Sequence, residues 1–141
     1  METEFFMPMI PPTTTHQPKK ITYINGKPHF YEEADLKDAR MKLEANLSKY
    51  IPKEKFTSAV SLITKWCFPI KGEHFDGDYK TSKPDTDNLQ KLLKDVMTDL
   101  GFWVDDALVC VDLCEKFWAK IPGIYIHIKE LPVNGYFKSE S

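Results

Sequence analysis

Apolar residues recur at three- and four-residue steps in two stretches, the period of an amphipathic helix. The stretches are residues 33–50 and 88–100. Asp87 is expected to cap the second helix, with Gln90 three residues later completing a capping box. Gly101 is expected to end it, because glycine readily adopts the left-handed conformation of a helix end. The second helix has the more regular stripe: Leu89, Leu92, Leu93, Val96, Met97 and Leu100.

Alternation of apolar and polar residues predicts strands over 59–68, 107–119 and 124–130. A shorter strand over residues 4–10 is expected at a sheet edge, because Pro8 cannot donate a ladder hydrogen bond. The dipeptide Asn25-Gly26 is a strong turn signal, and it predicts a β-hairpin over 20–31. The expected class is therefore a domain that contains both helices and strands.

Residues 71–82 are polar and glycine-containing and follow no periodic pattern, which predicts a long mobile loop. Such a loop beside an acidic cluster could grip a substrate, and a loop without a function is the alternative. Residues 133–141 form a polar tail that is expected to fray. No internal repeat or domain boundary is evident, so residues 1–141 are expected to form one domain.

The composition is that of an ordinary globular protein, with 42% hydrophobic and 13% aromatic residues. No apolar run approaches the roughly 20 residues that a membrane span needs. The start, Met1-Glu2-Thr3-Glu4, is acidic and lacks the basic beginning of a signal peptide, so a cytoplasmic protein is expected. An odd number of cysteines argues against a disulfide framework and favours inert core or strand thiols at Cys67, Cys110 and Cys114.

The formal net charge of −2 is weak evidence against a nucleic-acid-binding protein, which usually carries a basic excess. A cluster of catalytic carboxylates would lower the total, however, so the placement of the lysines matters more. One candidate phosphate contact is His16, in the proline-bounded loop over 11–18. The others lie near the acidic residues or on adjoining strands: Lys19, Lys20, Lys71, Lys80 and Lys83, with Lys65, Lys116 and Lys120 as further candidates. The alternative for each lysine is a solvated surface residue without a partner in DNA.

Two acidic pairs bracket the second helix. Asp85 and Asp87, the first acidic pair, precede it two residues apart, so in an extended segment their side chains point the same way. Paired carboxylates suit Mg²⁺ or Mn²⁺, and Lys91, one helical turn on, could hold a phosphate oxygen. Asp105 and Asp106, the second acidic pair, could add ligands. The alternative is a helix cap and a turn.

The second helix is roughly 20 Å long at 1.5 Å per residue. The two acidic pairs of one chain therefore cannot share a cation unless the segment after the helix folds back. A two-fold dimer with antiparallel neighbouring helices would bring the second pair of one chain to the first pair of the other. The spacing thus favours a homodimer with two composite sites.

The same residues resemble the RusA family of Holliday junction resolvases. The matching features are the Lys-Pro-Asp-x-Asp-Asn element at 83–88, Lys91, the Gly-x-x-Trp-x-Asp-Asp element at 101–106 and the turn Pro122-Gly123. The resemblance is close over about 83–128 and looser before it. The family's loop after its prolines often carries asparagine and arginine, and this chain departs from that pattern with Thr13-Thr14-Thr15-His16-Gln17.

The resemblance implies an α/β (α+β) homodimer in which a small mixed β-sheet is flanked by two main helices. It implies a Mg²⁺-dependent enzyme, with Mn²⁺ as a possible substitute, that cuts four-way or other branched DNA by paired nicks. It assigns Asp85, Asp87 and Asp106 as metal-binding catalytic residues, Asp105 as a possible further ligand, and Lys91 as the catalytic lysine. Such proteins are common in phages and prophages.

Two functions remain open at this point. One is a metal-dependent, junction-selective endodeoxyribonuclease, and the other is a non-catalytic branched-DNA-binding or assembly protein on the same fold. The joint presence of Asp85, Asp87, Lys91 and Asp106 favours the enzyme, because a binding protein needs no such set. Trp103 could stack on a base at the junction, but its apolar neighbours Phe102 and Val104 favour packing in the core.

Overall fold

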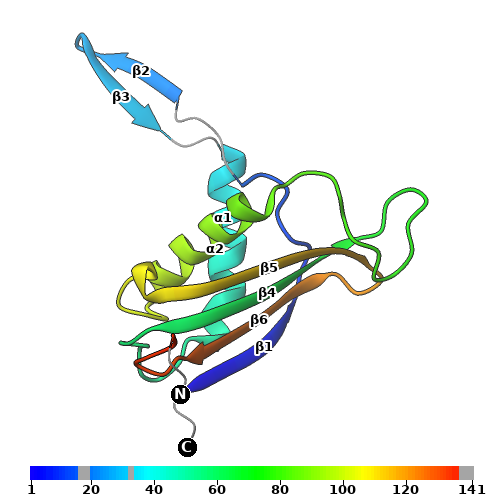
Figure 1. Cartoon of the computed structure of the whole chain (residues 1–141). Coiled ribbons are helices and arrows are strands. Elements are labelled where there is room, and N and C mark those ends of the chain that lie inside the picture. The colour runs from blue at the N-terminus through cyan, green and yellow to red at the C-terminus, as the bar shows by residue number, and fades with distance from the viewer. Residues whose placement is uncertain (16–19, 32–33, 137–141) are drawn as a thin grey trace, which may run out of the picture.

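The computed structural model describes residues 1–15, 20–31 and 34–136. Four strands form the main sheet and two long helices cover one of its faces (Figure 1). A separate two-stranded hairpin extends away from this body (Figure 1). The elements are β1 (Glu2–Pro8), β2 (Lys20–Ile24), β3 (Lys27–Tyr31), α1 (Ala34–Leu47), η1 (Ser48–Tyr50), β4 (Val60–Pro69), α2 (Thr86–Leu100), η2 (Asp106–Leu108), β5 (Val109–Ala119) and β6 (Gly123–Glu130).

The main sheet has the order β1-β6-β4-β5, so β1 and β5 are its edge strands. β4 pairs antiparallel with β6 and parallel with β5, and β6 pairs antiparallel with β1. The expected mixed sheet with two main helices is therefore confirmed. The chain reaches the parallel strand β5 through α2, the usual crossover between parallel strands.

Alternating residues of the central strands face the helices and form the core. On β4 these include Val60, Leu62 and Trp66, each 0% exposed, as the alternation in the sequence predicted. Ile124, Ile126 and Ile128 of β6 are equally buried. Trp103 is 1% exposed and donates from Nε1 to Thr98 Oγ1 at 2.7 Å, so it packs in the core as expected.

Helix α2 begins two residues earlier than expected. Its N-cap is Asp85, whose side chain makes no capping hydrogen bond, and Asp87 lies inside the first turn. The predicted capping box of Asp87 and Gln90 is therefore wrong, because the Gln90 side chain turns inward to the sheet. Gly101 ends α2 with φ 87°, the left-handed conformation predicted for it.

Strand β5 begins later than expected, because 106–108 form the short 3₁₀ helix η2 rather than strand. The Asp105 carboxylate accepts a hydrogen bond from the Ala107 N–H at 3.0 Å, and this local bond competes with extension. The hairpin of β2 and β3 is confirmed. Asn25 and Gly26 have φ values of 52° and 77°, the pair of positive values that a tight hairpin turn needs.

The irregular segment before α2 is held against the C-terminal half of β5. The Lys80 N–H donates to the Lys116 carbonyl at 3.0 Å, and backbone bonds at 2.8 Å join Trp118 to Gly77 and Asp78. The segment is a loop, as predicted, and its mobility stays a prediction. Its pairing covers the outer edge of β5 at residues 116–118 and leaves 109–115 uncovered by any described strand.

Candidate metal centre

The first acidic pair lies at the start of α2 with its carboxylates exposed. Asp85 is extended, with φ −76° and ψ 152°, and Asp87 follows in the first helical turn. Lys83 Nζ lies 3.3 Å from Asp85 Oδ2, in an exposed ion pair. Free N–H groups and the helix dipole make this end of α2 favourable for anions, both carboxylate and phosphate.

Lys91 stands one turn after Asp87 and is exposed. Neither the Asp87 carboxylate nor the Lys91 ammonium makes a hydrogen bond or ion pair with another residue in the described ranges. Surface charges of this kind commonly pair with a neighbour on the same helix. Both groups are thus free to engage a cation and a phosphate.

The second acidic pair lies where η2 begins. Asp105 is exposed and caps η2, whereas Asp106 is half-buried. Burial raises the pKa of the Asp106 carboxyl, and the hydrogen bond with Asp105 and the negative charges of Asp105 and Asp95 raise it further. The Lys94 ammonium opposes this shift. Carboxylates crowded in this way are stabilised by a proton or by a metal cation.

The two acidic pairs lie at opposite ends of α2, which has 15 residues and is therefore about 22 Å long. Within the described residues, no group of three or more His, Cys, Asp or Glu side chains could hold a metal ion. A single chain thus keeps the two acidic pairs apart. The oxygen donors themselves fit a hard divalent cation, because Asp85 and Asp87 present two exposed carboxylates separated by a single residue.

The structure places only three of the six predicted DNA contacts. His16 and Lys19 lie outside the described residues, as does the side chain of Lys20. Lys71, Lys80 and Lys83 line one cavity of about 220 Å³. Lys80 is only 7% exposed and its ammonium is already hydrogen-bonded, so it is a poor phosphate contact compared with the other two.

A second cavity, of about 460 Å³, adjoins the first acidic pair between α2 and β5. Asp87, Gln90 and Lys94 of α2 line it together with Asp112 of β5. Asp112 was not a candidate in the sequence, because an isolated aspartate in a strand carries no motif. Side chains two residues apart in a strand point to the same face, so Asp112 shares the helix-facing side of β5 with Trp118.

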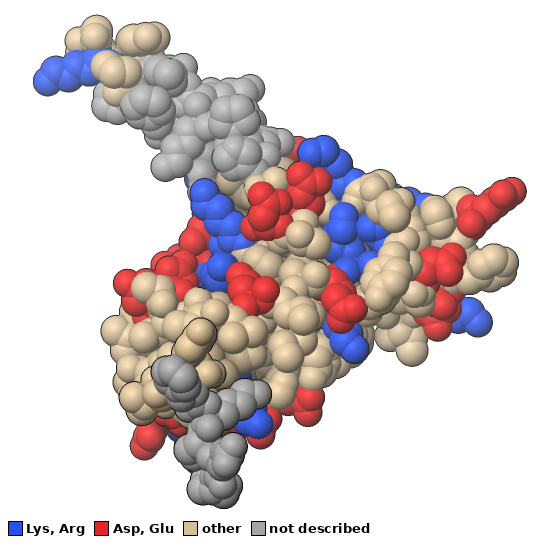
Figure 2. Space-filling model, viewed as in Figure 1, with Lys and Arg blue, Asp and Glu red and all other residues tan. Residues whose placement is uncertain are grey.

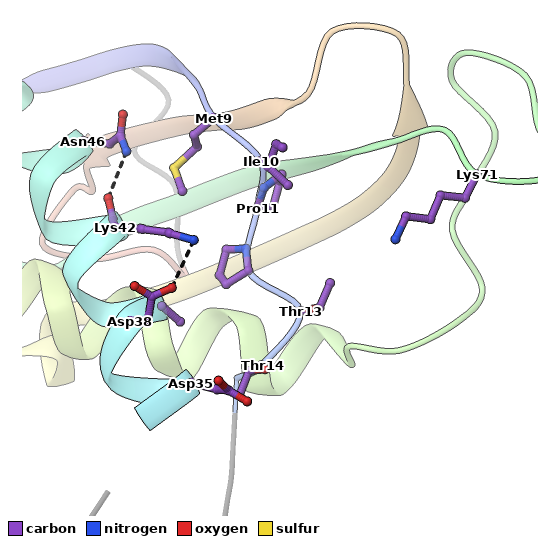
Figure 3. A pocket seen from close by; sticks show the side chains of 12 residues that line it. Met9, Ile10, Pro11, Thr13, Thr14, Asp35, Asp38, Lys42, Asn46 and Lys71 are labelled. Atoms are coloured by element: carbon purple, nitrogen blue, oxygen red, sulfur yellow. Dashed lines mark hydrogen bonds and ion pairs between the residues drawn. The ribbon is translucent and has the colours of Figure 1, made fainter. Parts of the chain in front are cut away.

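A third cavity, of about 560 Å³, lies elsewhere. It is formed between α1 and the chain that follows β1, and Lys71 extends toward it from the loop after β4 (Figure 3). Asp38 and Lys42 of α1 form an ion pair at its wall, with 3.0 Å between Oδ2 and Nζ (Figure 3). None of the four candidate metal ligands lines it.

The face of the molecule in Figure 2 carries acidic and basic side chains interspersed over the helices and the sheet. No single broad basic surface dominates the described residues on that face. This mixture matches the net charge of −2. Among the described residues, no helix is long and apolar enough to cross a membrane.

The comparisons with known proteins identify the family of the chain. The family model of the endodeoxyribonuclease RusA matches residues 9–129, which include both acidic pairs and Lys91. A crossover junction endodeoxyribonuclease, RusA, of Lactococcus phage r1t is 37% identical over 110 residues, covering 77% of this chain and 81% of the relative. The expected resemblance is thereby confirmed, and the chain belongs to the RusA family of endodeoxyribonucleases.

Proposed function

We propose that this chain is a metal-dependent endodeoxyribonuclease that resolves four-way DNA junctions, with each active site assembled from two copies of the chain. The observation that carries the proposal is the pair of incomplete acidic clusters, with an unengaged lysine beside the first. Family membership supports cleavage of DNA. The phage relative named as a crossover junction endodeoxyribonuclease supports the branched substrate.

Asp85, Asp87 and Asp106 are proposed to hold the cation, with Asp105 as a further ligand. Mg²⁺, or Mn²⁺ in its place, would polarise the phosphoryl group and lower the pKa of the attacking water. Lys91 is proposed to bind a phosphate oxygen and to stabilise the negative charge that develops there during hydrolysis.

The lysines beside the first acidic pair are proposed to position the DNA backbone. Lys83 and Lys71 lie at the cavity next to the start of α2, where the helix dipole also favours an anion. Contacts of this kind add affinity without reading sequence. His16, Lys19 and Lys20 remain proposed contacts from the sequence alone.

The edge strand β5 supports a specific dimer. On its outer side, residues 109–115 have no strand partner among the described residues, and Val111 and Leu113 are 47% and 45% exposed. An open edge with apolar side chains is a template for pairing with another chain. A second copy of β5, antiparallel to the first, is the proposed occupant.

This pairing would also complete the sites. Lys94 Nζ contacts Asp112 Oδ2 at 2.8 Å and Lys116 Nζ contacts the Pro84 carbonyl at 2.9 Å, so α2 runs antiparallel to β5. The first acidic pair therefore lies toward the end of β5 and the second at its start. A two-fold axis near Asp112, the middle of 109–115, would bring the start of one β5 beside the end of the other.

The test is cleavage of a synthetic four-way junction with and without Mg²⁺. Asp87→Asn is expected to lower the cleavage rate by about a hundredfold or more, equivalent to roughly 2.7 kcal/mol in transition-state stabilisation. Asp99→Asn, an exposed aspartate on the same helix, is the matched control and should cleave normally. Tight junction binding without cleavage in Mg²⁺ or Mn²⁺ would instead support a non-catalytic DNA-binding protein.

A further inference from the structure

Two lysine side chains converge on the turn that carries the first acidic pair. The Lys80 ammonium donates to Ser82 Oγ at 2.6 Å and to the Lys83 carbonyl at 2.5 Å. The Lys116 ammonium donates to the carbonyls of Ser82 and Pro84, at 2.8 Å and 2.9 Å. Three successive carbonyls, 82 to 84, thus each accept a hydrogen bond from a lysine immediately before Asp85.

Lys80 is buried in an unusual setting for a cation. It is 7% exposed, and its ammonium lies 5.1 Å from the ring centroid of Phe68 and 4.8 Å from that of Trp118. No ion pair joins it to a carboxylate of the described residues. Aromatic faces and carbonyl oxygens compensate the charge in place of an acid.

The position of these lysines within the fold explains their reach. Lys116 is on β5 and faces the helix layer, and the Lys80 N–H is bonded to the Lys116 carbonyl at 3.0 Å. The turn at 82–84 is therefore held against the edge strand β5 by hydrogen bonds, and its position does not depend on the loop alone. Charge-assisted hydrogen bonds of this type are stronger than neutral ones.

We propose that Lys80 and Lys116 are positioning residues that fix the 82–84 turn so that Asp85 presents its carboxylate beside Asp87. This inference rests on the proposed nuclease function. The lysines act through the backbone of the turn and touch neither the metal nor the DNA. Removing either should loosen the turn, weaken metal binding and slow cleavage, while the protein still binds the junction.

The experiment compares Lys80→Met and Lys116→Met with Lys37→Met, an exposed lysine on α1 that has no proposed role. Lys116→Met is expected to disturb folding less than Lys80→Met, because Lys116 is less buried than Lys80. Amide hydrogen exchange of residues 82–89 is measured without metal or DNA. The expected result is at least tenfold faster exchange in both variants and unchanged exchange in the control. Because this readout needs no activity, it distinguishes a failure of this inference from a failure of the proposed nuclease.

Cleavage and binding are then measured on a synthetic junction. The expected result is a fall of at least tenfold in kcat and a higher Mn²⁺ concentration for half-maximal rate, with junction affinity in Ca²⁺ changed by less than twofold. Lys116→Arg, which retains the charged donors, should recover most of kcat. Native exchange at 82–89 with a loss of junction affinity would overturn the proposal and make the two lysines phosphate contacts.

Discussion

At the scale of single residues, the buried side chain of Gln90 fixes the position of α2, the helix that carries the first acidic pair, against the sheet. It is 4% exposed and accepts from Thr64 Oγ1 at 2.8 Å and from Trp66 Nε1 at 3.2 Å, while its amide donates to Asp112 Oδ1 at 2.5 Å. The side chain thereby ties α2 to both β4 and β5. Because Gln90 is on α2 three residues after Asp87, this network sets the direction in which Asp87 and Lys91 face.

Gln90→Leu is expected to lower the free energy of unfolding by about 1–3 kcal/mol, because the buried Thr64 hydroxyl loses its acceptor. Urea unfolding measures this, with exposed Asp99→Asn as the control, expected to change by less than about 0.5 kcal/mol. The double variant Thr64→Val/Gln90→Leu should be less stable than Gln90→Leu alone, because the buried Trp66 N–H then loses both of its acceptors. An unchanged unfolding midpoint for Gln90→Leu would show that the network contributes nothing.

Cys114 illustrates a thiol shielded by the fold. Burial raises the pKa of the Cys114 thiol to about 11. The thiolate is the reactive form, so in a Cys67→Ser/Cys110→Ser variant alkylation at pH 8 should be slow in buffer and fast in urea. The folded state retains this proton more tightly than the unfolded chain. Its contribution to stability is therefore complete below about pH 9 and is lost as the pH rises toward 11.

Equal alkylation rates in buffer and in urea at pH 8 would contradict this account of Cys114.

The three thiols differ in their exposure, which the sequence did not reveal. All are free, as expected, but Cys110 is exposed on the edge strand, whereas Cys67 and Cys114 are partly buried. Cys110 is thus a strand thiol rather than a core thiol, and it is exposed because β5 has no strand partner beyond it among the described residues.

At the scale of elements, the unpaired outer edge of β5 is where a second chain is proposed to pair and complete the site. Its inner side is paired with β4 and its last residues with the loop at 77–80, yet 109–115 have no strand partner within the part of the chain that the structure describes. The sequence predicted a strand here but not its place in the sheet. Order and direction depend on the α2 crossover and on tertiary packing, which alternation of residues does not encode.

Val111→Lys is expected to convert a dimer into a monomer, because each introduced ammonium would lie opposite the apolar Leu113 of the other copy, with a second like charge diagonally across the two-fold axis. Analytical ultracentrifugation measures the change, and junction cleavage should fall at least tenfold with it. Met41→Lys, on an apolar residue of α1 that is 67% exposed, is the matched control and should leave both unchanged. A Val111→Lys protein that remains dimeric would place the interface elsewhere.

At the scale of the whole molecule, the sequence predicted what the backbone itself dictates. The rise of a helix is constant, so the separation of the acidic pairs followed from counting residues along α2. Gly101 and Asn25-Gly26 were predictable because positive φ values restrict the residue choice. The burial of Lys80 was not predictable, because its partners Phe68 and Trp118 come from other strands and meet it only in the fold.

The capping box failed for a related reason. Asp87 and Gln90 have the spacing of a local motif, but the buried Thr64 and Trp66 outcompete the helix terminus for the Gln90 side chain. Local signals are weak where a tertiary partner offers a buried polar group a better hydrogen bond. The candidate residues depended less on such contacts, because Asp85, Asp87 and Asp105 are exposed and all four aspartates were chosen by their chemistry and spacing.

The central claim is that each active site combines Asp87 of one chain with Asp106 of another. The most direct test is a mixed dimer, co-expressed with different tags, of one Asp87→Asn chain and one Asp106→Asn chain. In such a dimer one composite site carries both substitutions and the other carries neither. Each homodimer should be inactive on a four-way junction in Mg²⁺.

The account predicts that the mixed dimer nicks a single strand of the junction at about half the wild-type rate, because one intact site is restored. If each site lay within one chain, both sites of the mixed dimer would be damaged. A purified mixed dimer as inactive as the two homodimers would therefore contradict the account.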